Sequence, residues 1–220
     1  SDIISAGEDD FREHLESTLP KLKGDAPVQA EAIIKKWDNN KKYGKDFTFS
    51  TNELAEEYVA ENPNPAAVKK AAFIPEEYFA DVRYADLNGT ASKELVRYII
   101  SEYFCLSEPY RISVCDKLAA KLYAPDLHTC IENIYQDWLE KGADNKTKMI
   151  MVPYCIYASD TQILALKKQI ASWAEAQRGA LGAFVINAVA INGGSTALMM
   201  VNDISAKFPH NQVKKAAKAA

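Results

Sequence analysis

The sequence contains no long apolar run. Its longest uncharged apolar stretch, residues 149–159, is far shorter than the roughly 20 residues that a helix needs to cross a bilayer. The composition, with 48% apolar and 25% charged residues, is that of an ordinary water-soluble globular chain and excludes collagen-like or largely disordered proteins. We therefore expect a cytoplasmic location and no membrane contact.

Cysteine and histidine are both scarce. The four cysteines lie 10, 15 and 25 residues apart, without a CxxC pair or a nearby pair of histidines: Cys105, Cys115, Cys130 and Cys155. This spacing excludes the common zinc ligand sets and favours reduced thiols, with Cys105 and Cys130 as small core residues. His128 and Cys130 stand two positions apart on a predicted helix, so they point to different faces and predict no nucleophilic pair. The other two histidines are His14 and His210.

Sequence motifs of catalysis are absent. There is no nucleophile elbow, phosphate-binding loop, dinucleotide fingerprint or HExxH zinc pair, and Gly193-Gly194 is interpreted as a helix stop. Four carboxylates on one predicted helix are expected to coat its solvated face: Asp126, Glu132, Asp137 and Glu140. The sequence therefore predicts no catalytic, metal-binding or cofactor-binding residue, and no cofactor.

The charge of the chain is modest and unevenly distributed. The net charge is -4, made of 11 Lys/Arg against 18 Asp/Glu in residues 1–90 and 15 against 12 in residues 91–220. An excess of three positive charges in the second part is far below what phosphate neutralisation requires, which disfavours a nucleic-acid partner. One basic cluster is interpreted as a solvated loop balanced by Asp38 and Asp46, with contact to an anionic partner as its alternative: Lys35, Lys36, Lys41, Lys42, Tyr43 and Lys45.

From residue 91 onward, helix start and stop signals recur. Ser92 predicts one helix start, Ser107 with Pro109 the next, and Pro125 a third helix that ends at Gly142. The remaining signals are, in chain order, an apolar segment predicted as helix over residues 146–158, a capping box at residues 159–162, Gly179, Ser195 and Pro209. Apolar residues recur at helical spacing in these segments. All three tryptophans lie on or beside such stripes and are expected in the core: Trp37, Trp138 and Trp173.

The predicted helix starts recur at a constant interval. Those near residues 92, 126, 160 and 195 differ by 34, 34 and 35 residues, with a short break inside each unit. A repeat of this length built of two helices predicts an α-solenoid, in which neighbouring hairpins share one core. The alternative is an irregular helical bundle. Residues 91–220 are thus predicted to form four HEAT-like hairpins of an all-α superhelix, and we expect the chain to be part of a longer polypeptide.

The first ninety residues are less regular. We expect residues 1–90 to form an irregular helical region that packs on the solenoid. Its predicted elements are, in chain order, an acidic lead-in at residues 7–10, a helix ending at Leu19, a helix from Asp25 to Trp37, a polar loop over residues 39–46, helices starting at the capping box 50–53 and at Asn64-Pro65, and an ordered connector over residues 73–90.

Two parts of the chain resemble a known family. Residues 37–50 (WDNNKKYGKDFTFS) and 74–84 (IPEEYFADVRY) resemble the helical portion of large uncharacterised bacterial proteins grouped with the molybdate metabolism regulator. Residues 164–213 resemble the HEAT-like repeats that such proteins carry. The resemblance covers most of residues 20–220, implies a HEAT-like solenoid and supplies no catalytic residue. No oxyanion pocket for molybdate is marked in the sequence.

These observations favour a binding role over catalysis. The leading hypothesis is a non-enzymatic, helical-repeat segment of a larger bacterial protein, whose curved surface binds a protein partner or an adjacent domain of its own chain. The competing hypothesis is a DNA-acting enzyme similar to the HEAT-like DNA glycosylases. Such an enzyme needs a basic concave surface with aromatic side chains beside the exposed base, which the weak positive charge of residues 91–220 does not favour.

Overall fold

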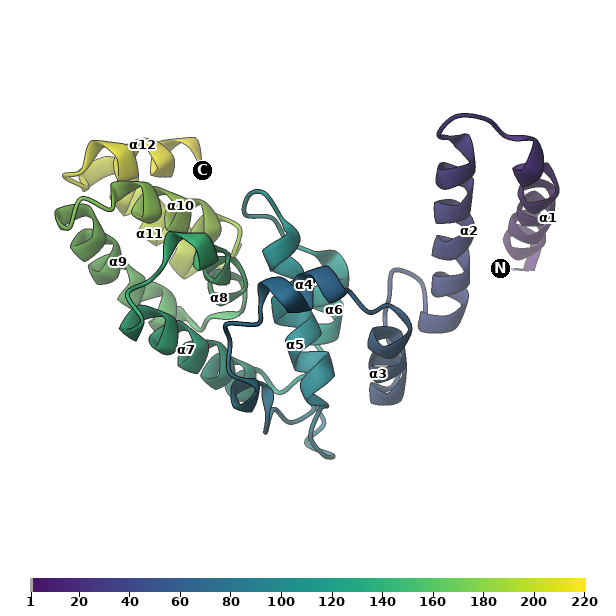
Figure 1. Ribbon diagram of the computed structural model, residues 1–220, viewed down its shortest axis with the longest axis horizontal. Helices are drawn as coiled ribbons and strands as arrows, with labels where there is room; N and C mark the ends of the chain where they lie inside the picture. The colour runs from purple at the N-terminus through teal and green to yellow at the C-terminus, as the bar shows by residue number, and fades with distance from the viewer. Residues whose placement is uncertain (1) are drawn as a thin grey trace. The chain divides into compact units, whose positions relative to one another are not determined.

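The chain is all-helical. A computed structural model describes residues 2–220, and side chains from Asp10 onward. Within this range there are twelve α-helices, four short 3₁₀-helices and no β-strand (Figure 1). None of the helices in this range is both long enough and apolar enough to span a membrane.

The chain divides into two compact units, residues 1–54 and residues 55–220. The helices of the first unit are α1 (Asp2–Thr18), η1 (Leu19–Lys21) and α2 (Ala26–Tyr43). The helices of the rest of the chain are α3 (Asn52–Glu61), α4 (Pro65–Lys70), η2 (Glu76–Phe79), α5 (Lys93–Ser101), η3 (Glu102–Cys105), α6 (Ser113–Ala119), α7 (Ala124–Glu140), η4 (Asn145–Ile150), α8 (Met151–Tyr157), α9 (Asp160–Glu175), α10 (Gly179–Ala190), α11 (Ser195–Lys207) and α12 (Asn211–Ala219).

The first unit is more helical than its polar sequence predicts. The expected acidic lead-in lies inside α1, and the expected loop over residues 39–46 is helical as far as Tyr43. Tyr43 is buried, with its ring centroid 5.8 Å from that of Phe49, and this contact holds the last turn of α2. The helix ends at Gly44, whose φ of +84° is a conformation that glycine adopts without strain.

Several helix starts are capped as their sequences predict. The Ser92 hydroxyl accepts a 3.0 Å hydrogen bond from the Leu95 amide at the start of α5. At α4, the Asn64 side chain accepts from the Ala67 amide. A complete capping box opens α9, with the Ser159 hydroxyl and the Gln162 side chain each accepting from the other's backbone amide. These caps satisfy amides that have no partner within the helix, so local sequence is enough to predict them.

One predicted helix start is wrong. Ser107 and Pro109 do not open a helix; α6 begins at Ser113, after a non-helical segment over residues 106–112. This segment carries Arg111, whose guanidinium donates to carbonyl oxygens at the C-terminal end of α10. The contacts of Arg111 with a part of the chain 80 residues away therefore outweigh the local helix signal.

The helices of residues 91–220 pack in consecutive pairs (Figure 1). Each helix contacts the next one along the chain in the pairs α5/α6, α7/α8, α9/α10 and α11/α12. Helices of neighbouring pairs also contact each other, α8 with α10, α10 with α12, and α9 with α11. The first helices of the four pairs begin at residues 93, 124, 160 and 195, close to the starts predicted from the sequence.

Aromatic side chains fill the space between the pairs. Trp138 of α7 and Trp173 of α9 are both buried, with their rings nearly perpendicular and the ring centroids 6.1 Å apart. Their predicted place in the core is confirmed. Trp37 is half-buried and meets the exposed ring of Phe11 edge-on at 5.8 Å.

The expected division at residue 90 falls inside the second unit. The connector before residue 90 is bonded to the start of α7, because Arg83 makes a two-pronged ion pair with Asp126 and its carbonyl accepts from the Tyr123 amide. A further backbone bridge joins Tyr84 to Leu122. The connector is thereby part of the same compact unit as the helix pairs.

Trp173→Ala tests the contribution of this packing to stability. Removing a fully buried indole leaves a cavity, so the free energy of unfolding should fall by about 3–5 kcal/mol. The matched control on the same helix is Leu164→Ala, which removes a side chain that is 55% exposed and should cost less than about 0.5 kcal/mol. Urea unfolding followed by circular dichroism measures both; equal losses would contradict the packing described here.

Candidate functional site

Hydrogen bonds from side chains to backbone carbonyl groups of the preceding helix pair span a nearly constant sequence interval. Three side chains donate to backbone carbonyl oxygens of the preceding pair, over separations of 34, 36 and 37 residues. They are Gln162 to His128 at 3.0 Å, Arg178 to Gly142 at 3.0 Å and Asn192 to Cys155 at 2.7 Å. An ion pair between Lys167 and Asp203, 36 residues apart, joins α9 to α11.

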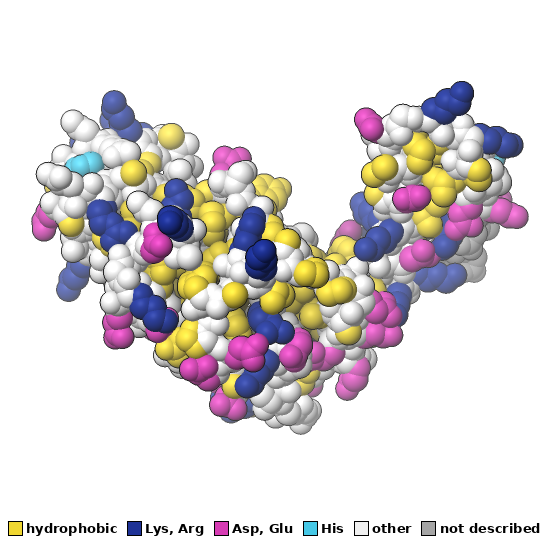
Figure 2. Space-filling view, viewed as in Figure 1, with side chains coloured by type: hydrophobic (Ala, Val, Ile, Leu, Met, Phe, Trp, Pro, Cys, Tyr) yellow, Lys and Arg dark blue, Asp and Glu magenta, His cyan; other side chains and the backbone are white. Residues whose placement is uncertain are grey.

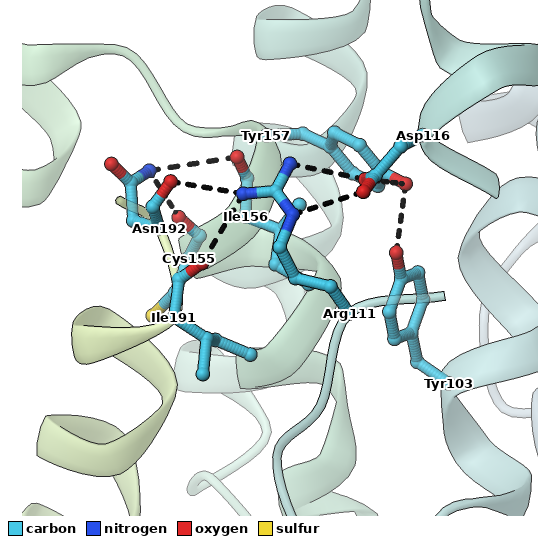
Figure 3. Close-up of polar contacts among 8 residues, drawn as sticks. All are labelled: Tyr103, Arg111, Asp116, Cys155, Ile156, Tyr157, Ile191 and Asn192. Atoms are coloured by element: carbon cyan, nitrogen blue, oxygen red, sulfur yellow. Dashed lines mark hydrogen bonds and ion pairs between the residues drawn. The ribbon is translucent and has the colours of Figure 1, made fainter. Parts of the chain in front are cut away.

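One group of connected polar side chains is the Arg111 cluster, made of Tyr103, Arg111, Asp116, Tyr157 and Asn192 (Figure 3). The Arg111 guanidinium pairs with both carboxylate oxygens of Asp116, at 2.9 and 3.1 Å. It also donates to the backbone oxygen of Asn192 at 2.9 Å, which satisfies a carbonyl just past α10. The Asn192 amide in turn donates to the carbonyl of Cys155, so the cluster ties three helix pairs together.

The Arg111 cluster is poorly suited to acid–base or nucleophilic chemistry. The Tyr103 and Tyr157 hydroxyls hydrogen-bond each other at 2.8 Å, and burial raises the pKa of both phenols. Beside them is a cavity of about 280 Å³ that is also lined by His128. Desolvation lowers the pKa of His128, and no described residue near it forms a nucleophile–base pair with it. The cluster therefore joins helices rather than offering a reactive group.

The cysteines divide by burial. Cys115, Cys130 and Cys155 are buried, and burial raises the pKa of each thiol, to about 12 for Cys130. Thiols with raised pKa values stay protonated at neutral pH, so these three cysteines are unreactive core residues. Cys105 was expected in the core as well, but it is exposed, because it ends η3 where the chain turns into the extended segment before α6.

The predicted solvated carboxylates of α7 do not all behave alike. Asp126 pairs with Arg83 and Asp137 with Lys141, while Glu140 is exposed. Glu132 departs from the prediction: it is half-buried and accepts hydrogen bonds from the Tyr154 hydroxyl at 2.9 Å and from the Gln162 amide at 2.9 Å. It joins α7, α8 and α9, so its role is structural.

The remaining candidates from the sequence stay apart from one another. Among the residues whose side chains are described, no group of three or more His, Cys, Asp or Glu has the arrangement of a metal site. His14 is exposed on α1, and His210 precedes α12. The basic cluster lies mainly on α2 rather than in a loop, and its Lys42 ammonium stands 5.2 Å from the Tyr43 ring centroid.

A groove lined by residues between 56 and 101 has a volume of about 770 Å³. Helices α3, α4 and α5 surround it. Apolar side chains that line it are exposed at its rim, among them Ala60, Pro63, Pro65 and Val68. In Figure 2, hydrophobic side chains reach the surface over α4, with charged side chains beside them. Hollow, mainly apolar surfaces of this size are typical of binding sites.

Two polar groups of the groove differ in how they are satisfied. The Glu56 carboxylate accepts from the Tyr84 hydroxyl at 2.6 Å, the Ser92 amide at 2.9 Å and the Ser92 hydroxyl at 2.5 Å. Ser101, at the end of α5, is 1% exposed, and its hydroxyl has no hydrogen-bond partner. A buried polar atom without a partner is uncommon, and here it lines the cavity.

Known proteins offer no guide to this groove. Comparison of the chain with protein families, with curated proteins and with solved structures gives no match. The candidate site therefore depends on the geometry alone.

Sequence analysis did not find the groove. Its lining residues come from three helices and include ordinary apolar types, so no motif marks them. A weak signal in the sequence is the apolar Val68 directly before two lysines, and only the structure shows that this side chain is exposed.

Arg111→Met tests the Arg111 cluster as a joint between helix pairs. The variant keeps an apolar stem but leaves Asp116 and two carbonyl groups without their donor, so unfolding free energy should fall by about 2 kcal/mol, a value reduced for partial solvent exposure. The control is Arg83→Met, which breaks a two-pronged ion pair of similar exposure but leaves no backbone carbonyl without its donor, so its cost should be smaller. Chemical unfolding of both variants gives the comparison, and an Arg111 effect no larger than the control would refute the role.

His128 gives a pH prediction with a defined sign. Desolvation lowers its folded-state pKa below the ordinary value of 6.5, so the unfolded chain binds the proton more readily. The free energy of unfolding therefore decreases as the pH falls through about 6.5, because the unfolded chain takes up the proton first. His128→Gln should lessen the loss of stability between about pH 7.5 and about pH 5.5. An unchanged pH slope in urea titrations would show that the histidine is not desolvated.

Proposed function

We propose that this chain is a non-enzymatic, HEAT-like helical-repeat scaffold that binds a protein partner, and that the groove between α3, α4 and α5 is its docking site. The groove is the observation that carries the proposal. It combines a volume of about 770 Å³ with exposed apolar side chains on its rim, such as Val68 at 40% exposure. Apolar surface left open to water is stabilised by a partner that covers it.

The repeat interpretation is supported by two regularities. The helices of residues 91–220 contact one another in consecutive pairs and between neighbouring pairs. Three side-chain bonds to backbone carbonyls of the preceding pair span 34 to 37 residues, as expected if equivalent positions of successive hairpins lie next to each other. An array of this kind offers an extended and rigid surface, which suits binding.

A binding role is also favoured by the state of the reactive groups. The three buried thiols have raised pKa values, and the Arg111 guanidinium is bonded to Asp116 and to backbone carbonyls. The DNA glycosylase alternative gains no support, because Trp138 and Trp173 contact each other in the core instead of facing a nucleic acid. The resemblance to the molybdate-regulator group stays a prediction.

Site-directed photo-crosslinking in the cells that make the protein tests the proposal. A photoreactive residue at Val68 should give a discrete protein adduct, whereas one at Lys215, exposed on α12, should not. Ala60→Glu, which puts a charge on the opposite wall of the groove, should reduce the Val68 adduct at least several-fold. Identical adducts at both positions, or none at Val68, would contradict the proposed function.

A further inference from the structure

We infer that the occupant of the groove is an amphipathic α-helix of the partner, with its apolar side inserted between α3 and α4. This inference rests on the proposed function and adds the form and charge of the partner. The other occupants, an extended peptide or a second copy of the chain, are distinguished by the experiments below.

The shape of the groove matches a helix. Its residues on α5 recur at helical spacing on one face, as Glu94, Arg97, Tyr98 and Ser101, and the N-cap residue Ser92 lies just before them. Nine residues of helix at 1.5 Å each give a floor about 14 Å long. Residues of α3 form one wall and residues of α4 the other. A trough with a helical floor and two helical walls receives a further helix through side chains at i, i+4 and i+7.

The space is open because α4 is short. It has six residues against nine in α5, and it packs on α5 and on η3. In the later pairs, α9 and α10 have 16 and 12 residues and contact each other directly. A helix docked beside α4 would extend the same helix-on-helix packing that already joins the pairs of this unit.

The charge of the α4 wall sets the expected charge of the partner. α4 contains Lys69 and Lys70 and no acidic residue. Lys69 lines the groove and forms no ion pair with a described residue. A complementary helix therefore carries an acidic side chain on the flank facing Lys69.

Ser101 adds a hydrogen-bonding requirement at the floor. Its hydroxyl is buried without a partner in the free protein. A small polar side chain on the docked helix, such as Ser, Thr or Asn, supplies the missing partner in a site from which water is excluded. The occupant is therefore apolar at its central positions except for one small polar residue.

Selection from displayed peptide libraries tests this description on the purified full chain. One library contains helix-forming sequences of about 14 residues with apolar positions at helical spacing, and a second contains sequences of equal length with strand-like alternation. We expect enrichment from the helical library only, with an acidic residue on one flank. Val68→Glu, which places a charge on the apolar wall, should weaken the binding of the selected peptides by tenfold or more.

Reversing the charge of Lys69 on the α4 wall tests the expected charge of the partner directly. Lys69→Glu should select clones with a basic residue in place of the acidic one, whereas Lys215→Glu, the same change on exposed α12, should leave the selected sequences as they are. Enrichment of clones that bind Val68→Glu equally well, or failure of both libraries to enrich, would overturn the helix proposal. Enrichment of the strand-like library alone would overturn it as well, while leaving the groove as a protein-binding site.

Ser101→Ala separates binding from structure. Because it removes an unsatisfied buried hydroxyl, the variant should be at least as stable as the parent chain in urea unfolding, yet bind the selected helices about five- to tenfold more weakly. A loss of stability with unchanged binding would show that the hydroxyl acts within the fold and does not meet the partner. Self-association at the groove is excluded if sedimentation of the free chain shows the same mass for the parent and for Val68→Glu.

Discussion

The contacts that α10 makes with its neighbours support the rest of the structure of residues 91–220. This helix carries no charged residue, and it packs against α8, α9, α11 and α12. A helix that is apolar on nearly all sides is stable only when other helices surround it. The helix pairs before and after α10 therefore depend on it for much of their buried surface, and it depends equally on them.

Polar contacts at the helix ends add to the stability that this apolar packing provides. The carbonyl groups at the end of α10 lie where an apolar environment would leave them unsatisfied, and the Arg111 guanidinium reaches them from the segment before α6. Asn192, just after α10, bonds the end of α8. These side chains hold the ends of helices from three pairs in a fixed register. Reactive groups in this region are thus used for structure, and the open apolar surface lies elsewhere, at α3, α4 and α5.

Sequence analysis could predict those features that depend on neighbouring residues. The caps at Ser92 and Ser159 need only the following turn of helix, and the stop at Gly193 needs only a residue that tolerates a φ of +78°. The segment before α6 could not be predicted this way, because Arg111 is held by carbonyls some 80 residues further along the chain. Glu132 was expected in solvent, yet it meets Tyr154 and Gln162 from two later helices. The groove was missed for the same reason, since Val68 and Ser101 share a cavity only once α4 and α5 have packed.

Native-state hydrogen exchange tests the central claim, that consecutive helix pairs stabilise one another around α10. We expect amides of α10 to exchange most slowly, through the opening of highest free energy. Helix α12, which packs on α10 and α11, should open at lower free energy. If α10 exchanged as fast as α12 or faster, neighbouring pairs would not depend on it, and the stacked arrangement proposed here would be contradicted.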